Sequence, residues 1–250
     1  MDADQRSAHI VARLREHDRV DVASLARELD TSEVTVRRDL DALAAAGVLR
    51  RVHGGAVSLL LRGEDLPFAL REQTDAEAKA RIARAAAALV TDGEAVIVDS
   101  GSTGLAVARA LAGRRLTVVP MSLPAATLLV ADGATTVKLP GGTATPGEGA
   151  LVGPLADATL RSLRVDTAFV TCCGLNATDG VMAYDDAEAV TKRTAMTSAR
   201  RRVLVAEAAK LQRSALAVIG PVSDVHVMVT DAPRAAVAEI EDQGVEVLCV

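Results

Sequence analysis

The stretch SEVTVRRDLDALAAAGVLRRVHGGA, residues 32–56, decides the fold of the first part of the chain. Its first half places Val36, Leu40 and Leu43 on one helical face, and Gly47 stands where such a helix would end. Its second half runs into VLRRVHGGAVSLL, in which apolar and polar residues alternate around a Gly-Gly turn. The stretch therefore predicts a helix followed by a two-stranded hairpin, or wing.

Two more helices are predicted upstream, over residues 5–17 and 22–29, because apolar residues recur at helical spacing in both. The third helix covers residues 32–46, and Ser32 has the side chain of a good N-cap. Three short helices followed by a wing are typical of a winged helix-turn-helix. We place this domain at residues 1–57.

The third helix predicts a surface that contacts DNA. When its apolar face is turned inward, Val34 and Arg38 point outward, Thr35 flanks them, and Arg37 lies on the other shoulder. Arginine binds guanine with two hydrogen bonds, and threonine contacts a thymine methyl group or a phosphate. On the wing, arginine and histidine beside a glycine turn suit contacts to the DNA backbone or the minor groove. The candidate DNA-binding residues are Ser32, Val34, Thr35, Arg37, Arg38, Arg50, Arg51 and His53.

Charge alone leaves an alternative open. The whole chain has a formal net charge of -5, and residues 1–57 hold nine arginines against ten acidic residues. Non-specific affinity for DNA comes from basic side chains that neutralise phosphates, so any basic surface must be local. A helical domain that docks onto another protein is the competing interpretation of this segment.

The second part of the chain predicts an α/β domain. We interpret residues 58–75 as a charged linker and residues 76–250 as the larger domain. Short β-branched runs alternate with alanine-rich helical stretches, which is typical of a mostly parallel sheet with helices on its faces. The predicted strands are 94–99, 116–120, 136–140, 166–172, 202–207, 226–231 and 245–250.

A turn after the first of these strands has the composition of an anion site. Asp99, Gly101, Ser102 and Thr103 lie between the strand EAVIVD and a helix. Glycine allows a tight turn, the first amides of a helix lack internal partners, and hydroxyl groups add donors for a phosphate. Turns of this composition also occur without a ligand. The glycine spacing matches neither a P-loop nor a dinucleotide-binding fingerprint.

Other strand ends add candidates for the same ligand. Gly141 and Gly142 would let backbone approach it closely, and Glu207 and Lys210 follow another strand. Ligands of open α/β sheets bind outside the carboxyl ends of the strands, so these turns converge if the sheet is parallel. Lysine is rare here, with only four among 28 basic residues, and Lys210 is the one we assign to a phosphate. A simple turn and a solvated lysine are the alternatives.

These motifs resemble the DeoR family of bacterial transcriptional regulators over nearly the whole chain. The N-terminal matches are Ser32, Thr35, Arg37-Arg38-Asp39-Leu40, Leu43 and His53-Gly54-Gly55-Ala56. The C-terminal matches are Asp99-Ser100-Gly101-Ser102-Thr103, Gly141-Gly142, Gly153-Pro154 and Lys210. The resemblance implies a winged helix-turn-helix that represses transcription until a sugar-phosphate type effector binds the C-terminal domain. It also implies a C-terminal fold shared with ribose-phosphate isomerases and CoA transferases.

The sequence departs from the family pattern around the expected effector site. Pro120 and Met121 precede Ser122 where the family has Thr-Asn-Ser, Thr171 stands where a glycine is usual, and Glu207 replaces an aspartate. We keep Ser122 among the effector-binding candidates. The departures leave the identity of the effector open, an atypical one included.

Several further expectations complete this interpretation. We predict a repressor of a carbohydrate-metabolism operon that binds operator DNA and a small phosphorylated metabolite. We expect a homo-oligomer, a dimer or a tetramer, because two linked DNA-binding domains bind DNA more tightly than one. An isomerase or acyl transferase that uses Asp99 or Glu207 as base, and a regulator whose effector site is vestigial, are the alternatives.

Composition also indicates where the protein is located and which cofactors it needs. The N-terminus lacks the features of a signal peptide, and no apolar run is long enough to span a bilayer, so we expect a cytoplasmic protein without a membrane partner. We expect no metal and no cofactor. Cys172 and Cys173 are interpreted as reduced thiols rather than as nucleophiles, and His226 as a core residue on an apolar strand.

Overall fold

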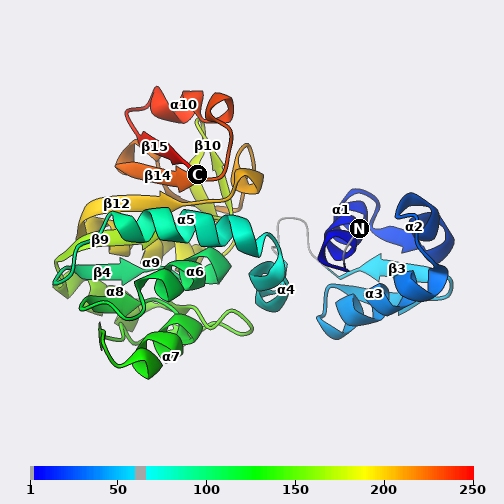
Figure 1. Cartoon of the computed structure of the whole chain (residues 1–250), viewed down its shortest axis with the longest axis horizontal. Coiled ribbons are helices and arrows are strands. Elements are labelled where there is room, and N and C mark those ends of the chain that lie inside the picture. The colour runs from blue at the N-terminus through cyan, green and yellow to red at the C-terminus, as the bar shows by residue number, and fades with distance from the viewer. Residues whose placement is uncertain (1–2, 60–65) are drawn as a thin grey trace. The chain divides into compact units, whose positions relative to one another are not determined.

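A computed structural model describes residues 3–59 and 66–250 of the chain (Figure 1). Its contacts divide the chain into two compact units, Met1–Asp75 and Ala76–Val250. We call them the DNA-binding unit, after the winged helix-turn-helix expected from the sequence, and the sensor unit, after the effector site expected in it, and describe each by itself. Within the described residues, no helix combines the length and the apolar character needed to cross a bilayer.

The DNA-binding unit is a winged helix-turn-helix, as predicted. Its elements are α1 (Ala3–His17), β1 (Arg19–Asp21), α2 (Val22–Glu28), α3 (Glu33–Ala45), β2 (Leu49–Val52) and β3 (Gly55–Ser58). The sequence did not predict β1, which pairs antiparallel with β3 and widens the hairpin to a three-stranded sheet of order β1-β3-β2. Three residues are too few for an alternating pattern to be recognised.

Local residue choices explain this unit. Ser32 caps α3, because its Oγ accepts a hydrogen bond from the Thr35 backbone N. Val36 and Leu40 on the inner face of α3 are fully buried. In the wing, Gly54 has the positive φ of the turn, and Gly55 permits close strand packing. A Cβ at Gly55 would lie 2.0 Å from the Val20 carbonyl oxygen in β1.

The segment expected to be a linker contains a short helix, α4 (Phe68–Gln73). Leu66 and Leu70 of this segment pack against the core of the DNA-binding unit. Helix α4 is therefore part of the DNA-binding unit by packing as well as by its position in the chain. Only Thr74 and Asp75 separate its end from the first helix of the sensor unit.

The sensor unit is built on a seven-stranded sheet of order β15-β14-β12-β9-β4-β5-β6, and all neighbouring strands are parallel. Its strands are β4 (Ala95–Val98), β5 (Thr117–Pro120), β6 (Thr136–Val137), β9 (Val165–Val170), β12 (Ala199–Val205), β14 (Val227–Thr230) and β15 (Glu246–Cys249). Each lies in one of the seven segments predicted as strands or overlaps it. Because the strands are parallel, their carboxyl ends meet at one edge.

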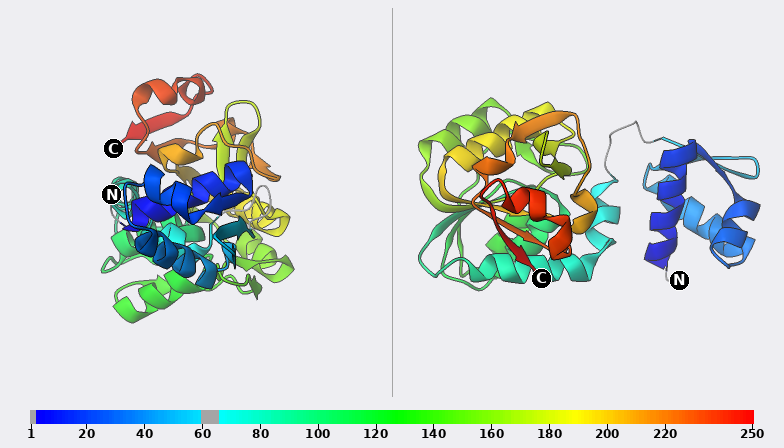
Figure 2. Two further views of the ribbon diagram at one scale, coloured as in Figure 1. Left: turned by 90° about the vertical axis from the view of Figure 1, so that its right-hand side faces the viewer. Right: turned by 90° about the horizontal axis from the view of Figure 1, so that it is seen from above.

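Helices cover both faces of this sheet (Figure 2). They are α5 (Ala76–Ala88), α6 (Gly101–Leu111), α7 (Leu123–Asp132), α8 (Pro154–Ser162), α9 (Asp186–Thr197) and α10 (Ala238–Glu241), with 3-10 turns η1 (Ala208–Lys210), η2 (Val222–Asp224) and η3 (Arg234–Ala236). Helix α5 packs against α6, and α8 packs against α9. The predicted α/β class is confirmed.

Two small antiparallel sheets were not predicted. One has the order β10-β11-β13, from β10 (Gly174–Asn176), β11 (Gly180–Ala183) and β13 (Ala217–Gly220). The other pairs β7 (Thr143–Ala144) with β8 (Leu151–Val152). The interpretation of His226 as a core residue was wrong, because its side chain is exposed and accepts a hydrogen bond from the Arg202 backbone N at Nδ1.

Candidate DNA interface and ligand site

Helix α3 presents its N-terminal half to solvent. Val34 is 61% exposed although its side chain is apolar, and Arg38 is also exposed. No hydrogen bond or ion pair involves the Arg38 side chain within residues 3–59 and 66–250. Thr35 is half-buried, and its Oγ1 lies 2.9 Å from Ser32 Oγ. The outward direction predicted for Val34 and Arg38 is the one the structure has.

Two other arginines of the motif, Arg37 and Arg51, have partners. Arg37 forms an ion pair with Glu33 one turn earlier in α3, at 2.7 Å between Nη2 and Oε2. Arg51 on β2 donates from Nη1 to Asp41 Oδ1 at 2.9 Å and to the Arg37 carbonyl oxygen at 3.1 Å. Arg51 therefore ties the wing to α3. This contact favours a positioning role for Arg51 over a direct DNA contact.

Exposed basic groups remain on the wing. Arg50 alternates with Arg51 along β2 and is exposed, and His53 is exposed at the turn between β2 and β3. Asp39, within the Arg-Arg-Asp-Leu run, is instead buried against α1, where Arg6 donates from Nε to its Oδ2 at 2.7 Å. The motif thus combines two functions: Asp39 joins α1 to α3, and Arg38 faces solvent.

The sensor unit brings several of the predicted ligand residues to the turn between β4 and α6. Gly101, Ser102 and Thr103 form the first turn of α6 and are buried. No side-chain hydrogen bond from Ser100 caps this helix. Gly101 has φ +86°, and a Cβ at Gly104 would lie 2.2 Å from the Asp99 carbonyl oxygen. The turn therefore needs its glycines, and its first amides lack a side-chain cap.

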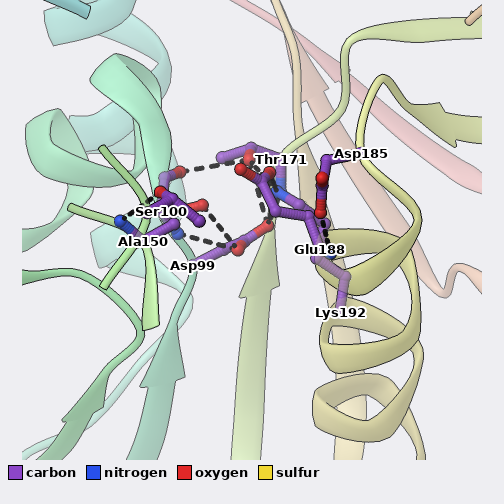
Figure 3. Close-up of polar contacts among 8 residues, drawn as sticks. Asp99, Ser100, Ala150, Thr171, Asp185, Glu188 and Lys192 are labelled. Atoms are coloured by element: carbon purple, nitrogen blue, oxygen red, sulfur yellow. Dashed lines mark hydrogen bonds and ion pairs between the residues drawn. The ribbon is translucent and has the colours of Figure 1, made fainter. Parts of the chain in front are cut away.

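Asp99 lies at the centre of this turn and is 1% exposed. Its Oδ1 accepts a hydrogen bond from the Ser100 backbone N at 2.7 Å. Its Oδ2 accepts from the Thr171 backbone N at 2.8 Å, from Thr171 Oγ1 at 3.0 Å and from Lys192 Nζ at 2.7 Å. Figure 3 shows these side chains turned toward one another from the ends of β4 and β9 and from α9. Both carboxylate oxygens are engaged.

Lys192 is a member of the site that the sequence analysis missed. It is 3% exposed, and its Nζ also lies 3.8 Å from Glu188 Oε2. Burial acts to lower the pKa of Lys192, but the Asp99 and Glu188 carboxylates outweigh it, and the net pKa is raised. Burial raises the pKa of Glu188, although Lys192 acts in the opposite direction. The Lys192 ammonium is therefore a permanent charge at neutral pH.

Glu207 occupies a second polar cluster at the carboxyl end of β12. Its Oε1 accepts a hydrogen bond from Thr103 Oγ1 at 2.7 Å and lies 3.6 Å from Lys79 Nζ on α5. Glu207 and Lys79 are both 6% exposed. The structure thus joins two predicted residues, Glu207 and Thr103, and adds Lys79, which the sequence analysis did not single out.

Lys210, the lysine we assigned to the ligand from sequence, lies half-buried at the end of η1. Its backbone N donates to the Glu207 carbonyl oxygen at 2.9 Å. Its charge acts on the neighbouring thiol of Cys172, although burial dominates there and raises the pKa of Cys172 to about 12. Lys210 and Glu207 therefore stand beside the end of β9, where Thr171 contacts Asp99.

The remaining candidates, Ser122, Gly141 and Gly142, stabilise turns and a helix end near neighbouring strands. Ser122 caps α7, accepting from the Ala125 backbone N at 3.4 Å, and pairs in an isolated bridge with Ala150. Gly141 and Gly142 follow β6 with positive φ, and a Cβ at Gly142 would lie 2.4 Å from the Val152 carbonyl oxygen. The structure gives no contact that joins these three residues to Asp99.

Chemically, the arrangement suits binding of an anion. Ser102 is 5% exposed, and its hydroxyl has no hydrogen-bond partner within the described parts of the chain. It lies in the uncapped first turn of α6, where amides and the helix dipole favour negative charge. Among the described residues, no group of three or more histidine, cysteine or acidic side chains is placed to hold a metal ion.

Two family profiles match successive parts of the chain. The profile of the DeoR-like helix-turn-helix domain matches residues 6–60, and that of the DeoR C-terminal sensor domain matches residues 74–232. The transcriptional repressor AccR of Agrobacterium fabrum is 33% identical over 236 residues, which are 94% of this chain and 92% of that protein. A glycerol-3-phosphate regulon repressor of Haemophilus influenzae is 31% identical over 247 residues, 98% of this chain and 96% of that protein.

One further relative and one solved structure are also similar to parts or most of the chain. The repressor CsqR of Escherichia coli is 33% identical over 249 residues, 97% of this chain and 94% of that protein. Among solved structures, ribose 5-phosphate isomerase A of Methanocaldococcus jannaschii overlaps 55% of each chain with 18% identity and a TM-score of 0.42, too low to support an argument. The two family matches and the full-length relatives show that the chain belongs to the DeoR family of DNA-binding transcriptional regulators.

Proposed function

We propose that this regulator is a repressor of a carbohydrate-metabolism operon and that a small phosphorylated metabolite bound at the β4–α6 turn releases it from operator DNA. The observation that carries the ligand assignment is Ser102, a residue only 5% exposed whose hydroxyl forms no hydrogen bond among the described residues, in the uncapped first turn of α6. The Haemophilus influenzae relative, whose name refers to the glycerol-3-phosphate regulon, supports a phosphorylated ligand.

The proposed ligand residues play different parts. Backbone amides of the first turn of α6, with the hydroxyls of Ser102 and Thr103, bind the phosphate. Lys210 approaches it as a point charge from η1. Asp99 holds the turn in place through Ser100 and Thr171, and Gly141, Gly142 and Ser122 line the neighbouring strand ends as second-rank candidates.

On the DNA side, Arg38 and Val34 contact base edges in the major groove, and Ser32, Thr35 and Arg37 contact phosphates or flanking bases. Arg50 and His53 contact the backbone or the minor groove from the wing. Arg51 acts indirectly, because its guanidinium bonds α3. One DNA-binding unit makes few base contacts, so the regulator acts as a dimer or tetramer whose DNA-binding units bind two half-sites.

A binding role without catalysis fits the engagement of the two candidate bases. Both Asp99 oxygens accept hydrogen bonds, and Glu207 Oε1 is held by Thr103 and Lys79. A general base must be within reach of a substrate proton, whereas both oxygens of Asp99 and one oxygen of Glu207 are engaged within the protein.

The test is fluorescence anisotropy with labelled DNA from upstream of the regulator's own gene, at near-physiological salt and against a scrambled duplex. We expect specific binding, and weakening of it by a phosphate ester. Arg38→Ala should lose about 1–3 kcal/mol of specific binding and retain ligand binding, whereas Lys210→Ala should bind DNA but respond less to ligand. Equal binding of both duplexes, unchanged by any phosphate ester, would contradict the proposal, and turnover of a sugar phosphate would favour an enzyme.

A further inference from the structure

We propose that the buried ion pair between Lys79 and Glu207 transmits occupancy of the ligand site to the segment that leads into the DNA-binding unit. The inference rests on the proposed function, since it assigns the route by which that same site regulates DNA binding. Lys79 is the fourth residue of α5, and α5 is the first helix of the sensor unit. Lys79 therefore lies between the ligand site and the segment that leads into the DNA-binding unit.

At the ligand end, two side chains approach one carboxylate oxygen of Glu207. Glu207 Oε1 accepts a hydrogen bond from Thr103 Oγ1 at 2.7 Å and lies 3.6 Å from Lys79 Nζ. The side chains of Lys79 and Glu207 are each 8% exposed, so water screens their attraction weakly. Thr103 follows Ser102 in the first turn of α6. The pair is thus one hydrogen bond away from the proposed phosphate site.

An arriving phosphate would alter this arrangement in a definite direction. Its negative charge repels the Glu207 carboxylate and attracts the Lys79 ammonium and the Thr103 hydroxyl. Both donors now held by Glu207 are therefore drawn toward the ligand. The contact between β12 and α5 that runs through Glu207 and Lys79 weakens, and the first turn of α5 is free to shift.

At the other end, α5 is joined to α4 by a short connection. Only Thr74 and Asp75 lie between the two helices, and Asp75 has φ +51°, the left-handed conformation. Helix α4 packs against the core of the DNA-binding unit through Leu70. A two-residue connection gives little slack, so a shift of the first turn of α5 is passed on to α4.

This route predicts how a bound ligand changes the affinity of the chain for DNA. The ligand favours the state in which the Lys79–Glu207 pair is broken, and DNA favours the state in which it is formed. By linkage, bound ligand therefore lowers the affinity for DNA, and bound DNA lowers the affinity for the ligand by the same factor. Typical coupling between two sites changes affinity by about 5-fold to 150-fold. Lys192, also buried and paired with Asp99, lies on α9 and has no such place beside the connection.

The experiment measures how a ligand changes the DNA affinity of the full-length chain. The probes are inorganic phosphate, glycerol 3-phosphate and glucose 6-phosphate, each tested for binding by its effect on the melting temperature. Anisotropy then gives the Kd for DNA with and without a saturating probe. The variants are Lys79→Met, which keeps length and removes charge, and Lys138→Met, an exposed lysine of the same unit, as the matched control.

We expect the wild type and Lys138→Met to lose at least about fivefold in DNA affinity with a probe. In Lys79→Met the loss at a saturating probe should be less than about twofold, while the probe still raises the melting temperature, by less than in the wild type because one cation that attracts the ligand is gone. If Lys79→Met does not fold, Glu207→Gln removes the same ion pair but keeps an acceptor for Thr103, and the same result is expected. A wild-type-sized loss in either variant would overturn the inference and leave the proposed function standing. A wild type that no probe affects, in DNA affinity or in melting temperature, would overturn both.

Discussion

Replacing Asp99 by asparagine should be among the most destabilising single changes in the sensor unit. The Asp99 Oδ2 accepts from two Thr171 donors and from Lys192 Nζ, and Oδ1 accepts from Ser100. An asparagine has one acceptor oxygen, so whichever way its amide turns, an NH2 group faces donors. The buried Lys192 ammonium also loses its closest counter-charge. Breaking a buried pair by removing one partner costs about 3–5 kcal/mol.

The reverse change, Lys192→Met, should cost less. Asp99 would keep its donors from Ser100 and Thr171, and hydrogen bonds to a charged group contribute about 1.5–3 kcal/mol each. The double variant Asp99→Asn with Lys192→Met leaves neither charge of this ion pair. Its loss of stability should therefore be smaller than the sum of the two single losses, by about 0.5–3 kcal/mol.

Tyrosine fluorescence can measure the stability of the two single variants and of the double variant. It has no tryptophan and a single tyrosine, Tyr184, which belongs to the sensor unit, where its hydroxyl accepts a hydrogen bond from Arg213. Tyrosine fluorescence during urea unfolding therefore reports the sensor unit alone. Losses that add within about 0.3–0.5 kcal/mol, or a loss below about 1 kcal/mol for Asp99→Asn, would refute the view that this ion pair organises the site.

Three further outcomes follow from the site. Gly104→Ala should destabilise the sensor unit by about 1–3 kcal/mol or more in the same urea assay, because the new Cβ would lie 2.2 Å from the Asp99 carbonyl oxygen; a loss below about 0.5 kcal/mol would contradict that close approach. Cys172, whose pKa burial raises to about 12, should escape iodoacetamide at pH 8 while exposed Cys249 reacts, as judged by peptide mass spectrometry, and equal labelling would contradict its burial. Burial raises the pKa of Glu188, so its carboxylate is disfavoured in the folded state, and its contribution to stability falls as pH rises from its ordinary pKa through the raised one. The urea midpoint of the wild type relative to Glu188→Gln should therefore be higher at pH 5 than at pH 8, and a difference of opposite sign would contradict this.

The fold was largely predictable because it follows from local periodicity. Strands buried on both faces appear as short β-branched runs, and each of the seven predicted runs contributed one strand to the parallel sheet. The helical spacing of Val36 and Leu40 likewise fixed the outward direction of Arg38. Short elements such as β1, with three residues, carry too little pattern to be recognised, and α4 lies in a stretch whose charged composition suggested a linker.

The site was only partly predictable, because its decisive contacts join residues far apart in the chain. Lys192 reaches Asp99 across 93 positions, and Thr103 reaches Glu207 across 104. The scarcity of lysine was a usable signal: two of the four lysines, Lys79 and Lys192, are buried in ion pairs at these strand ends. Lys210 was chosen from this small group because it followed a strand, whereas the two buried lysines stand on helices and look locally like solvated residues.

The departures from the family pattern acquire a physical meaning from these contacts. Thr171, where a glycine is usual, supplies a side chain whose Oγ1 accepts from Lys192 at 3.0 Å and lies within hydrogen-bonding distance of both Asp99 Oδ2 and the Ser100 carbonyl oxygen. Its Cγ2 would lie 3.7 Å from a Cβ at Gly104, so the methyl group fills space beside the first turn of α6. A glycine would leave that volume and those hydrogen-bonding groups to a ligand. If the effector binds at this turn as proposed, the threonine favours an effector that is smaller, or has fewer hydroxyl groups, on the side that faces β9.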